Sequence, residues 1–204
     1  MGSVKFGSKS IQPTKILCVG RNYVDHIKEL NNPVPDHMVV FNKPPSSITT
    51  QLNSYQGEPL HYEGEICFMI NGGQFCAVGL GLDLTKRQLQ SELKSNGLPW
   101  ERAKAFDGSA VFSRFIAIEG IHVDSLQIEL FINCVRVQKG SVSDMIYSPQ
   151  TILQELATYT SLVDGDIVMT GTPQGVGVVH QGDVFLGRLS CQDQIVLEVE
   201  WVAG

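Results

Sequence analysis

The sequence predicts a mainly β fold with a few helices, in the α+β class. Strand-like segments rich in Val, Ile and Phe recur along the 204 residues and are bounded by Gly, Asn, Asp and Pro. Only three segments carry the caps and apolar spacing that are typical of helices. No repeat, low-complexity tract or linker divides the chain. We therefore expect a single domain over residues 1–204, in which residues 1–14 form a short N-terminal arm.

Ten short segments are predicted to be strands. In chain order they are residues 15–20, 38–41, 63–70, 75–80, 110–118, 126–133, 134–138, 166–170, 183–186 and 194–202. The run Ile-Cys-Phe-Met-Ile at 66–70 is apolar throughout, as in a core strand.

The first helix is predicted from about Tyr23 to Leu30. Asn22 precedes it as an N-cap, and the run Asn-Asn-Pro at 31–33 is a stop signal. Because residues 31–38 are rich in Asn and Pro, we expect this stretch to form a mobile lid.

The second helix has the clearest boundary signals. Thr85 is the predicted N-cap, Gln88 completes a capping box, and Gly97 with Pro99 ends the helix. Asp83 lies two residues before the cap, where a strand meets the positive end of a helix dipole. This position favours a functional acid, although caps also recruit acids for local reasons.

The third helix is predicted to open at Ser148, with Pro149 at the first helical position. Ile152, Leu153 and Leu156 then share one face, which predicts that this face packs against the core.

Composition and charge exclude several classes of protein. The net charge of −6 argues against a nucleic-acid partner, because phosphate binding needs clustered Lys and Arg. No apolar stretch approaches the roughly 18–20 residues that span a bilayer, and the N-terminus lacks a signal-peptide pattern. Five cysteines, an odd number without C-x-x-C spacing, indicate free thiols. We expect no membrane association and a cytoplasmic location.

Two glutamates and one aspartate form a candidate metal site. Glu63 and Glu65 would share one face of a strand, roughly 6–7 Å apart along the chain, and Asp83 follows in the run Gly-Leu-Asp-Leu-Thr. Like charges this close repel unless a proton or a cation lies between them. Carboxylates alone select hard cations such as Mg²⁺, Mn²⁺ or Ca²⁺. The alternative is that both glutamates face water, as most glutamates do.

A histidine–glutamate pair lies on the first predicted helix. The three-residue spacing of His26 and Glu29 lets the carboxylate hold one imidazole nitrogen, while the other nitrogen can take a proton from water. The same spacing also arises by chance on solvated helices, so the pair alone does not establish a site.

A glycine-rich loop, Thr-Gly-Thr-Pro-Gln-Gly-Val-Gly, occupies residues 170–177. It is not a P-loop, because no Gly-Lys-Ser/Thr follows. Its backbone N–H groups can bind a small anion such as a carboxylate. A tight turn between strands explains the same residues equally well.

Three more polar side chains are candidates for the same pocket. Lys104 has mostly apolar neighbours in sequence, so it can stabilise developing negative charge from a buried position or extend to the surface. Arg87 and Gln90 lie on the helix after Asp83 and point either to the pocket or to solvent.

The order of these motifs resembles that of the fumarylacetoacetate hydrolase family, and within it the small acylpyruvase-type members. The resemblance extends from about Ile16 to Val199. The motifs that carry it are GRNYxxHxxE, Lys-Pro-Pro-Ser-Ser at 43–47, HYExE, LDLTxRxxQ, GLPWExAKAFD and TGTPxGVG.

This resemblance implies a fold, a cofactor and a substrate class. Members of the family have a distorted β-sandwich or roll and usually form homodimers. They hold Mg²⁺ or Mn²⁺ through two glutamates and an aspartate, here Glu63, Glu65 and Asp83. Their substrates are small 2-oxo acids.

The resemblance also implies roles for the remaining candidates. His26 and Glu29 match the pair that deprotonates water, and Lys104 matches the group that steadies the enolate oxygen. The expected substrate contacts are Arg21, Arg87, Gln90 and Thr172.

The main functional prediction is a Mg²⁺-dependent hydrolase that cleaves the C–C bond of acylpyruvates by way of a pyruvate enolate held on the metal. The alternative is oxaloacetate decarboxylation or tautomerisation, or isomerisation of a 2-hydroxyhepta-2,4-diene-1,7-dioate type of acid, at the same site. A relative that binds metal and ligand without catalysis is a third possibility.

Three departures from the family pattern bear on these predictions. The segments 51–60 and 71–80 look shorter than usual, and the second shortening predicts that Asp83 is held less firmly. Asn133-Cys134 replaces the usual Asn-Gly of a hairpin, where a cysteine at positive φ would cost on the order of 1 kcal/mol.

Overall fold

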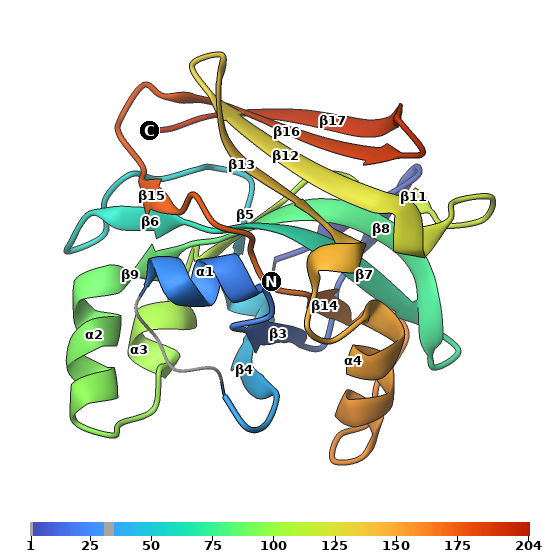
Figure 1. Cartoon of the computed structure of the whole chain (residues 1–204), viewed down its shortest axis with the longest axis horizontal. Helices are drawn as coiled ribbons and strands as arrows, with labels where there is room; N and C mark the ends of the chain where they lie inside the picture. The colour runs from blue at the N-terminus through green and yellow to red at the C-terminus, as the bar shows by residue number, and fades with distance from the viewer. Residues whose placement is uncertain (1, 31–34) are drawn as a thin grey trace.

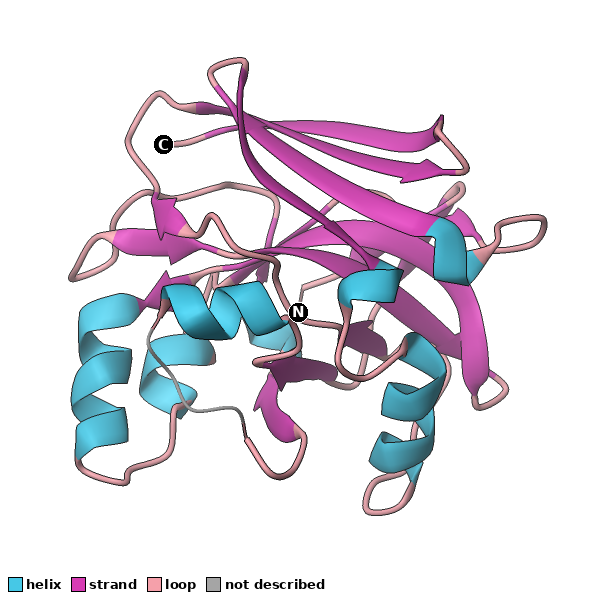
Figure 2. Cartoon of the chain, viewed as in Figure 1, coloured by secondary structure: helices cyan, strands magenta, loops and turns pink. Residues whose placement is uncertain are grey.

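A computed structural model describes residues 2–30 and 35–204 of the chain and confirms the predicted mainly β fold (Figure 2). Residues 31–34, the first half of the predicted lid, lie outside the described residues. The strands form one large mixed sheet, a four-stranded sheet, and two small sheets of three and two strands.

The large sheet contains the strands that carry the acidic residues. Its order is β4 (Val39–Lys43), β3 (Ile16–Gly20), β14 (Ile167–Met169), β7 (Gly64–Asn71), β8 (Gln74–Asp83), β10 (Ala110–Phe112) and β5 (Ile48–Thr49), with β11 (Ile116–Ala117) also paired to β8. The β14–β3 and β10–β5 pairs are parallel, and the other pairs are antiparallel.

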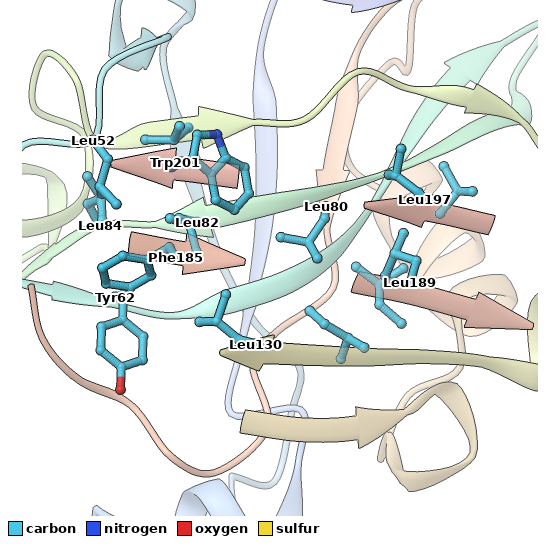
Figure 3. Close-up of a cluster of buried hydrophobic side chains, with 14 of the residues drawn as sticks. Leu52, Tyr62, Leu80, Leu82, Leu84, Leu130, Phe185, Leu189, Leu197 and Trp201 are labelled. Atoms are coloured by element: carbon cyan, nitrogen blue, oxygen red, sulfur yellow. The ribbon is translucent and has the colours of Figure 1, made fainter. Parts of the chain in front are cut away.

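The second sheet is antiparallel and covers one face of the large sheet. Its order is β13 (Val135–Ser141), β12 (Leu126–Ile132), β16 (Val184–Cys191) and β17 (Gln194–Val202). In Figure 1 it lies above the large sheet, while the helices lie below. Between the two sheets lies the largest apolar core, in which Leu80 and Leu82 of β8 meet Leu130, Phe185 and other side chains (Figure 3).

Two small sheets complete the β structure. One joins β15 (Gly177–Val178), β6 (Leu60–Tyr62) and β9 (Thr85–Lys86). Its strand β6 ends two residues before β7 begins. The other is a hairpin of β1 (Val4–Phe6) and β2 (Lys9–Ile11), which lies within the predicted N-terminal arm.

Alternation along β7 decides where the acids lie. Ile66 and Phe68 point into the core between the sheets, whereas Cys67 and Met69 belong to a second apolar cluster on the opposite face. Because side chains alternate along a strand, Glu65 lies on the same face as Cys67. The candidate site is therefore on the side of the large sheet that faces the helices.

The structure contains four α-helices among the described residues: α1 (Val24–Glu29), α2 (Arg87–Ser95), α3 (Glu101–Lys104) and α4 (Pro149–Ala157). The first, second and fourth correspond to predicted helices, and the one-turn α3 was missed. Short 3₁₀ turns occur at Pro45–Ser47, Val123–Ser125 and Val142–Asp144. The Ser148 cap of α4 is confirmed, since its hydroxyl accepts from the Thr151 N–H at 3.2 Å.

The predicted caps of the other two helices are wrong. Asn22 does not cap α1; its amide group donates to the Tyr147 and Thr170 carbonyls and ties three segments together. Thr85 lies in β9, and neither it nor Gln88 forms a capping box. Instead, the Glu58 carboxylate accepts from the Gln88 N–H at 2.9 Å, so a residue remote in sequence satisfies this helix end.

Strand boundaries also differ in detail from the prediction. The segment 110–118 is two strands, β10 and β11, rather than one. The strand predicted at 75–80 extends to Asp83, so the acid is part of the sheet. Asn133 and Cys134 have φ of 49° and 68°, as a type I′ turn requires. No described helix is long and apolar enough to cross a membrane, and all five cysteines are free thiols.

Candidate metal centre and active site

Three buried carboxylates meet at the end of the β7–β8 pair. One oxygen each from Glu63, Glu65 and Asp83 lies within 4.8 Å of the others. The Asp83 N–H donates to the Glu63 carbonyl at 2.9 Å, and Glu65 pairs with Gly81, so the strand register brings the acids together. All three are at most 6% exposed, which excludes the alternative that the glutamates face water. Asp83 is fully buried, and the predicted effect of the short 71–80 segment on it stays a prediction.

Lys104 reaches into this carboxylate cluster from α3. Its ammonium group donates to Glu63 Oε2 at 2.8 Å, Asp83 Oδ2 at 2.7 Å and Thr85 Oγ1 at 2.6 Å. Burial alone would lower its pKa, but the charges of Asp83 and Glu63 raise the pKa above its ordinary value. Lys104 therefore stays protonated inside the site. The alternative prediction, that it extends to the surface, is wrong.

A second buried lysine, Lys43, was not predicted as a site residue. Its Nζ lies 2.8 Å from Asp83 Oδ1, and its side chain is fully buried. The ammonium group donates to the backbone carbonyls of Lys104 and Ser109, and the Leu84 carbonyl is 3.5 Å away. Lys43 is the first residue of the Lys-Pro-Pro-Ser-Ser motif, and this position was the sequence signal that could have identified it as a site residue. Because it holds the carbonyl of Lys104, Lys43 links the end of α3 to the carboxylates.

Glu63 and Glu65 have opposite electrostatic surroundings. Burial would raise the pKa of Glu63, but the cations Lys104 and Arg87 outweigh it and hold the pKa well below its ordinary value. Burial and the neighbouring Asp83 and Glu63 raise the pKa of Glu65 well above its ordinary value, opposed by the Gly171 N–H. Arg87 forms an ion pair with Glu63 and donates to Gln90 Oε1 at 2.8 Å.

The donor set fits a hard divalent cation. Asp83 Oδ1 is buried and accepts no hydrogen bond, because the Lys43 ammonium directs its donors to backbone carbonyls. Glu65 accepts from the Gly171 N–H at 2.7 Å, and no salt bridge to it is formed by the described residues. Unsatisfied carboxylate oxygens are the ligands that Mg²⁺ and Mn²⁺ prefer.

The predicted histidine–glutamate pair is present on α1. His26 Nδ1 lies 3.3 Å from Glu29 Oε2. His26 is only 6% exposed, whereas the side chain of Glu29 is partly open to solvent, so the imidazole is not on a solvated face. Burial lowers the pKa of His26, although the charge of Glu63 and the bond to Glu29 oppose the shift. A neutral imidazole at neutral pH follows, with Nε2 as the nitrogen that Glu29 does not contact.

The glycine-rich loop binds carboxylates, but they are the protein's own. The Gly171 N–H donates to Glu65, and the Gly175 N–H donates to Glu29 Oε1 at 3.0 Å. Thr172 donates through its hydroxyl to the Gly64 carbonyl at 2.9 Å. The loop therefore orients one candidate metal ligand and the partner of the candidate base.

Nine of the ten predicted site residues line one pocket. The tenth, Glu29, does not line it but contacts His26, which does. The other lining residues, which sequence analysis did not select, are Val19, Gly20, Leu30, Phe41, Lys94 and Trp100. Arg21 adopts a left-handed backbone with φ of 58°, and its guanidinium lies 5.9 Å from the centre of the Trp100 ring. The buried Nε atoms of Arg21 and Arg87 have no hydrogen-bond partner among the described residues.

The chain is similar to several known proteins over most of its length. Oxaloacetate tautomerase YcgM from Escherichia coli (strain K12) is 34% identical over 83% of this chain and 85% of its own. The mitochondrial oxaloacetate tautomerase FAHD2 of Oryza sativa subsp. japonica is 38% identical over 83% of each chain. The fumarylpyruvate hydrolase of Pseudomonas aeruginosa, solved in complex with Mn²⁺ and pyruvate, is 26% identical, with a TM-score of 0.88 over 98% of this chain and 94% of that one.

The family assignment follows from the extent of these matches. The Fumarylacetoacetate (FAA) hydrolase C-terminal family matches residues 15–201, which include every candidate site residue. The order of the motifs, the curled β fold and the buried carboxylates are consistent with that match. The chain belongs to the fumarylacetoacetate hydrolase family.

Proposed function

We propose that this chain catalyses the keto–enol tautomerisation of a small 2-oxo dicarboxylic acid, with oxaloacetate as the substrate and Mg²⁺ or Mn²⁺ as the cofactor. The observation that carries the proposal is the convergence of three buried carboxylates, a charged lysine and a neutral histidine on one pocket. Relatives that cover most of this chain are oxaloacetate tautomerases, which supports this reaction over the acylpyruvate hydrolysis that the sequence favoured.

Glu63, Glu65 and Asp83 would hold the cation. When bound, the cation would supply Lewis acidity toward the carboxylate and keto oxygens of a 2-oxo acid. Lys104 is protonated, and its three donors go to Glu63, Asp83 and Thr85. A cation held by the carboxylates would take the place of some of these bonds, and the freed N–H could then donate to negative charge on the keto oxygen.

His26 is the proposed proton carrier. Its neutral imidazole accepts the proton as the C3–H bond breaks, and the electron pair of that bond forms the C2–C3 double bond. The imidazolium then returns one proton to the C2 oxygen, which leaves the enol and restores the neutral histidine. Glu29 holds Nδ1 and directs Nε2 toward the reaction.

The charges around the pocket favour a substrate with two carboxylates. Arg21, Arg87 and Lys94 all line it. Burial lowers the pKa of Lys94, and the charges of Arg21 and Arg87 lower it further, so the cations are crowded. A second carboxylate would relieve this repulsion and supply an acceptor for the unpaired Nε atoms.

Hydrolysis of acylpyruvates is the second candidate. The His26–Glu29 pair has the arrangement expected of a general base that activates water, which tautomerisation does not require. The similarity to a fumarylpyruvate hydrolase also supports this reaction. Decarboxylation of oxaloacetate and isomerisation of unsaturated 2-oxo diacids would use the same residues.

A substrate panel tests these candidates. EDTA-treated protein, with and without added Mg²⁺ or Mn²⁺, would be given oxaloacetate, acetylpyruvate and fumarylpyruvate, with enol absorbance and product release recorded. Cation-dependent tautomerisation that exceeds cleavage in kcat/KM supports the proposal. Faster cleavage of an acylpyruvate would support the hydrolase, whereas tight Mn²⁺ and oxalate binding without any turnover would support a non-catalytic relative.

That the chain forms a homodimer and that it is located in the cytoplasm are both predictions from the sequence. Size-exclusion chromatography with light scattering would give the mass of the assembly. Localisation needs a direct test, since the relatives include bacterial and mitochondrial proteins.

A further inference from the structure

Gln138 connects the second sheet to the carboxylate site. It lies in β13, the edge strand of the four-stranded sheet, where it pairs with Leu130. Its side chain is buried, with 1% exposure for the residue. A buried amide in an otherwise apolar sheet interface is costly unless its polar atoms are paired. All of its amide hydrogen bonds go to the two segments that carry the site.

The first segment is Glu63–Gly64–Glu65, at the start of β7. Gln138 Oε1 accepts from the Gly64 N–H at 2.9 Å, across 74 residues of sequence. That N–H belongs to the peptide between Glu63 and Gly64, so the bond fixes the backbone between the two glutamates. A Cβ at Gly64 would lie 2.9 Å from Gln138 Oε1, so any larger residue here would have to displace the glutamine amide.

The second segment is the glycine-rich loop. Gln138 Nε2 donates to Thr172 Oγ1 at 2.8 Å and to the Pro173 carbonyl at 2.8 Å. Thr172 in turn donates to the Gly64 carbonyl. Gly64 is therefore fixed at both its N–H and its carbonyl, directly by Gln138 and indirectly through Thr172.

The loop held in this way carries the amides that orient two site carboxylates. The Gly171 N–H, one residue before Thr172, donates to Glu65, and the Gly175 N–H, two residues after Pro173, donates to Glu29. Displacement of the loop would therefore move a candidate metal ligand and the partner of the histidine together.

We propose that Gln138 is a positioning residue for the cation site. It acts through Gly64 and through residues 171–175 to set the separation of Glu63 and Glu65 and the direction of the Glu65 carboxylate. It does not reach substrate or cation itself. Groups that orient ligands in this way change metal affinity about 10–100-fold when they are removed.

Two variants separate this role from simple stabilisation. Gln138→Met keeps the length of the side chain and removes all three hydrogen bonds. Gln138→Glu keeps an acceptor for Gly64 but removes the donors to Thr172 and Pro173. The matched control is Leu189→Ala in the same sheet, which opens a cavity in the shared core without touching the loop.

The measurement is the Kd for Mn²⁺, obtained by titrating EDTA-treated protein and reading free Mn²⁺ by electron paramagnetic resonance, with Tm recorded in parallel. We expect Gln138→Met and Gln138→Glu to raise the Kd at least about tenfold. Leu189→Ala should lower Tm at least as much as the Gln138 variants do. Its Kd for Mn²⁺ should stay within about twofold of the wild-type value.

Three results would overturn the proposal: a wild-type Kd in Gln138→Met, an equal rise in Kd in Leu189→Ala, or no Mn²⁺ binding by the wild-type protein. The inference rests on the cation site of the proposed function but not on the reaction. Because the assay contains no substrate, a failure of tautomerase activity and a failure of the positioning role give different results.

Discussion

The Gly175 N–H donates to Glu29 Oε1 at 3.0 Å, although 146 residues separate the two. This bond places the loop after β14 against the helix that carries His26. Gly175 has φ of 99°, and a Cβ on it would collide with the Val137 carbonyl. The loop can therefore reach Glu29 only with glycine at this position.

Replacing Gly175 with alanine should displace the loop and impair catalysis. We expect Gly175→Ala to lower kcat at least about tenfold, since His26 loses its orienting partner, and to lower Tm. The control is Gly182→Ala, which has a similar φ of 85° but no atom within 4 Å of the added Cβ. It should lose stability by about 1 kcal/mol from backbone strain with kcat retained. Equal kcat values in the two variants would contradict the assigned role of the loop.

The pH dependence of activity should follow His26. Because burial lowers its pKa, the imidazole is neutral at pH 7 and kcat/KM should fall only when the pH drops through a value below 6.5. Glu29 raises that pKa, so Glu29→Gln should move the acid limb of the kcat/KM profile to lower pH. An acid limb that moves to higher pH would contradict this account.

Removing one carboxylate should abolish tight cation binding. We expect Glu65→Gln to raise the Kd for Mn²⁺ at least about a hundredfold, because a charged ligand becomes a neutral one. Mn²⁺ at 100 times the wild-type Kd should stabilise wild-type protein by about 2.7 kcal/mol and the variant far less. Calorimetry and thermal unfolding measure both effects. Glu129→Gln in the four-stranded sheet is the control and should bind Mn²⁺ normally.

Lys104 should affect stability and catalysis separately. In cation-free protein, Lys104→Met removes the ammonium that Glu63 and Asp83 share and leaves only Arg87 and Lys43 beside them, so it should cost about 3–5 kcal/mol of unfolding free energy in urea. With saturating cation, part of this stability should return, while kcat stays about 10²–10³-fold low because a donor to the developing charge is missing. Lys9→Met, exposed on β2, should change neither quantity. Normal kcat in Lys104→Met would remove the lysine from the mechanism.

Arg21 should select substrates by their second carboxylate. We expect Arg21→Gln to lower kcat/KM for oxaloacetate about tenfold to a hundredfold, since a hydrogen bond to a charged group contributes about 1.5–3 kcal/mol. The same variant should lose little activity on acetylpyruvate, which has one carboxylate. Parallel losses on both substrates would show that Arg21 does not contact the distal group.

Local sequence patterns suggested the acids and the histidine–glutamate pair but left open whether they form a site. The two-residue spacing of Glu63 and Glu65 places them on one face, and the three-residue spacing of His26 and Glu29 pairs them on a helix, as the structure shows. These predictions succeed because strand and helix periods depend on the backbone alone. The order of the motifs along the chain supplied the rest of the site through its resemblance to the family.

Predictions that depended on hydrogen-bond partners failed more often. Thr85 has a good capping signal, yet its hydroxyl accepts from Lys104 and the end of α2 is satisfied by Glu58. Asn22 likewise bonds to backbone at 147 and 170 instead of capping α1. A polar side chain takes the partner that tertiary packing brings to it, and local sequence does not contain that partner.

The sequence by itself determined the strand-rich fold, the acidic residues and the histidine–glutamate pair, because these follow from short-range periodicity and from motif order. Only the tertiary structure decided that Lys43 neutralises Asp83, that the glycine loop binds the protein's own carboxylates, and that Gln138 joins the second sheet to the site. The physical reason is that each of these contacts spans tens of residues. Lys43 meets Asp83, and the glycine loop meets Glu65, only when distant strands pair in the large sheet, and Gln138 meets Gly64 only when the two sheets pack.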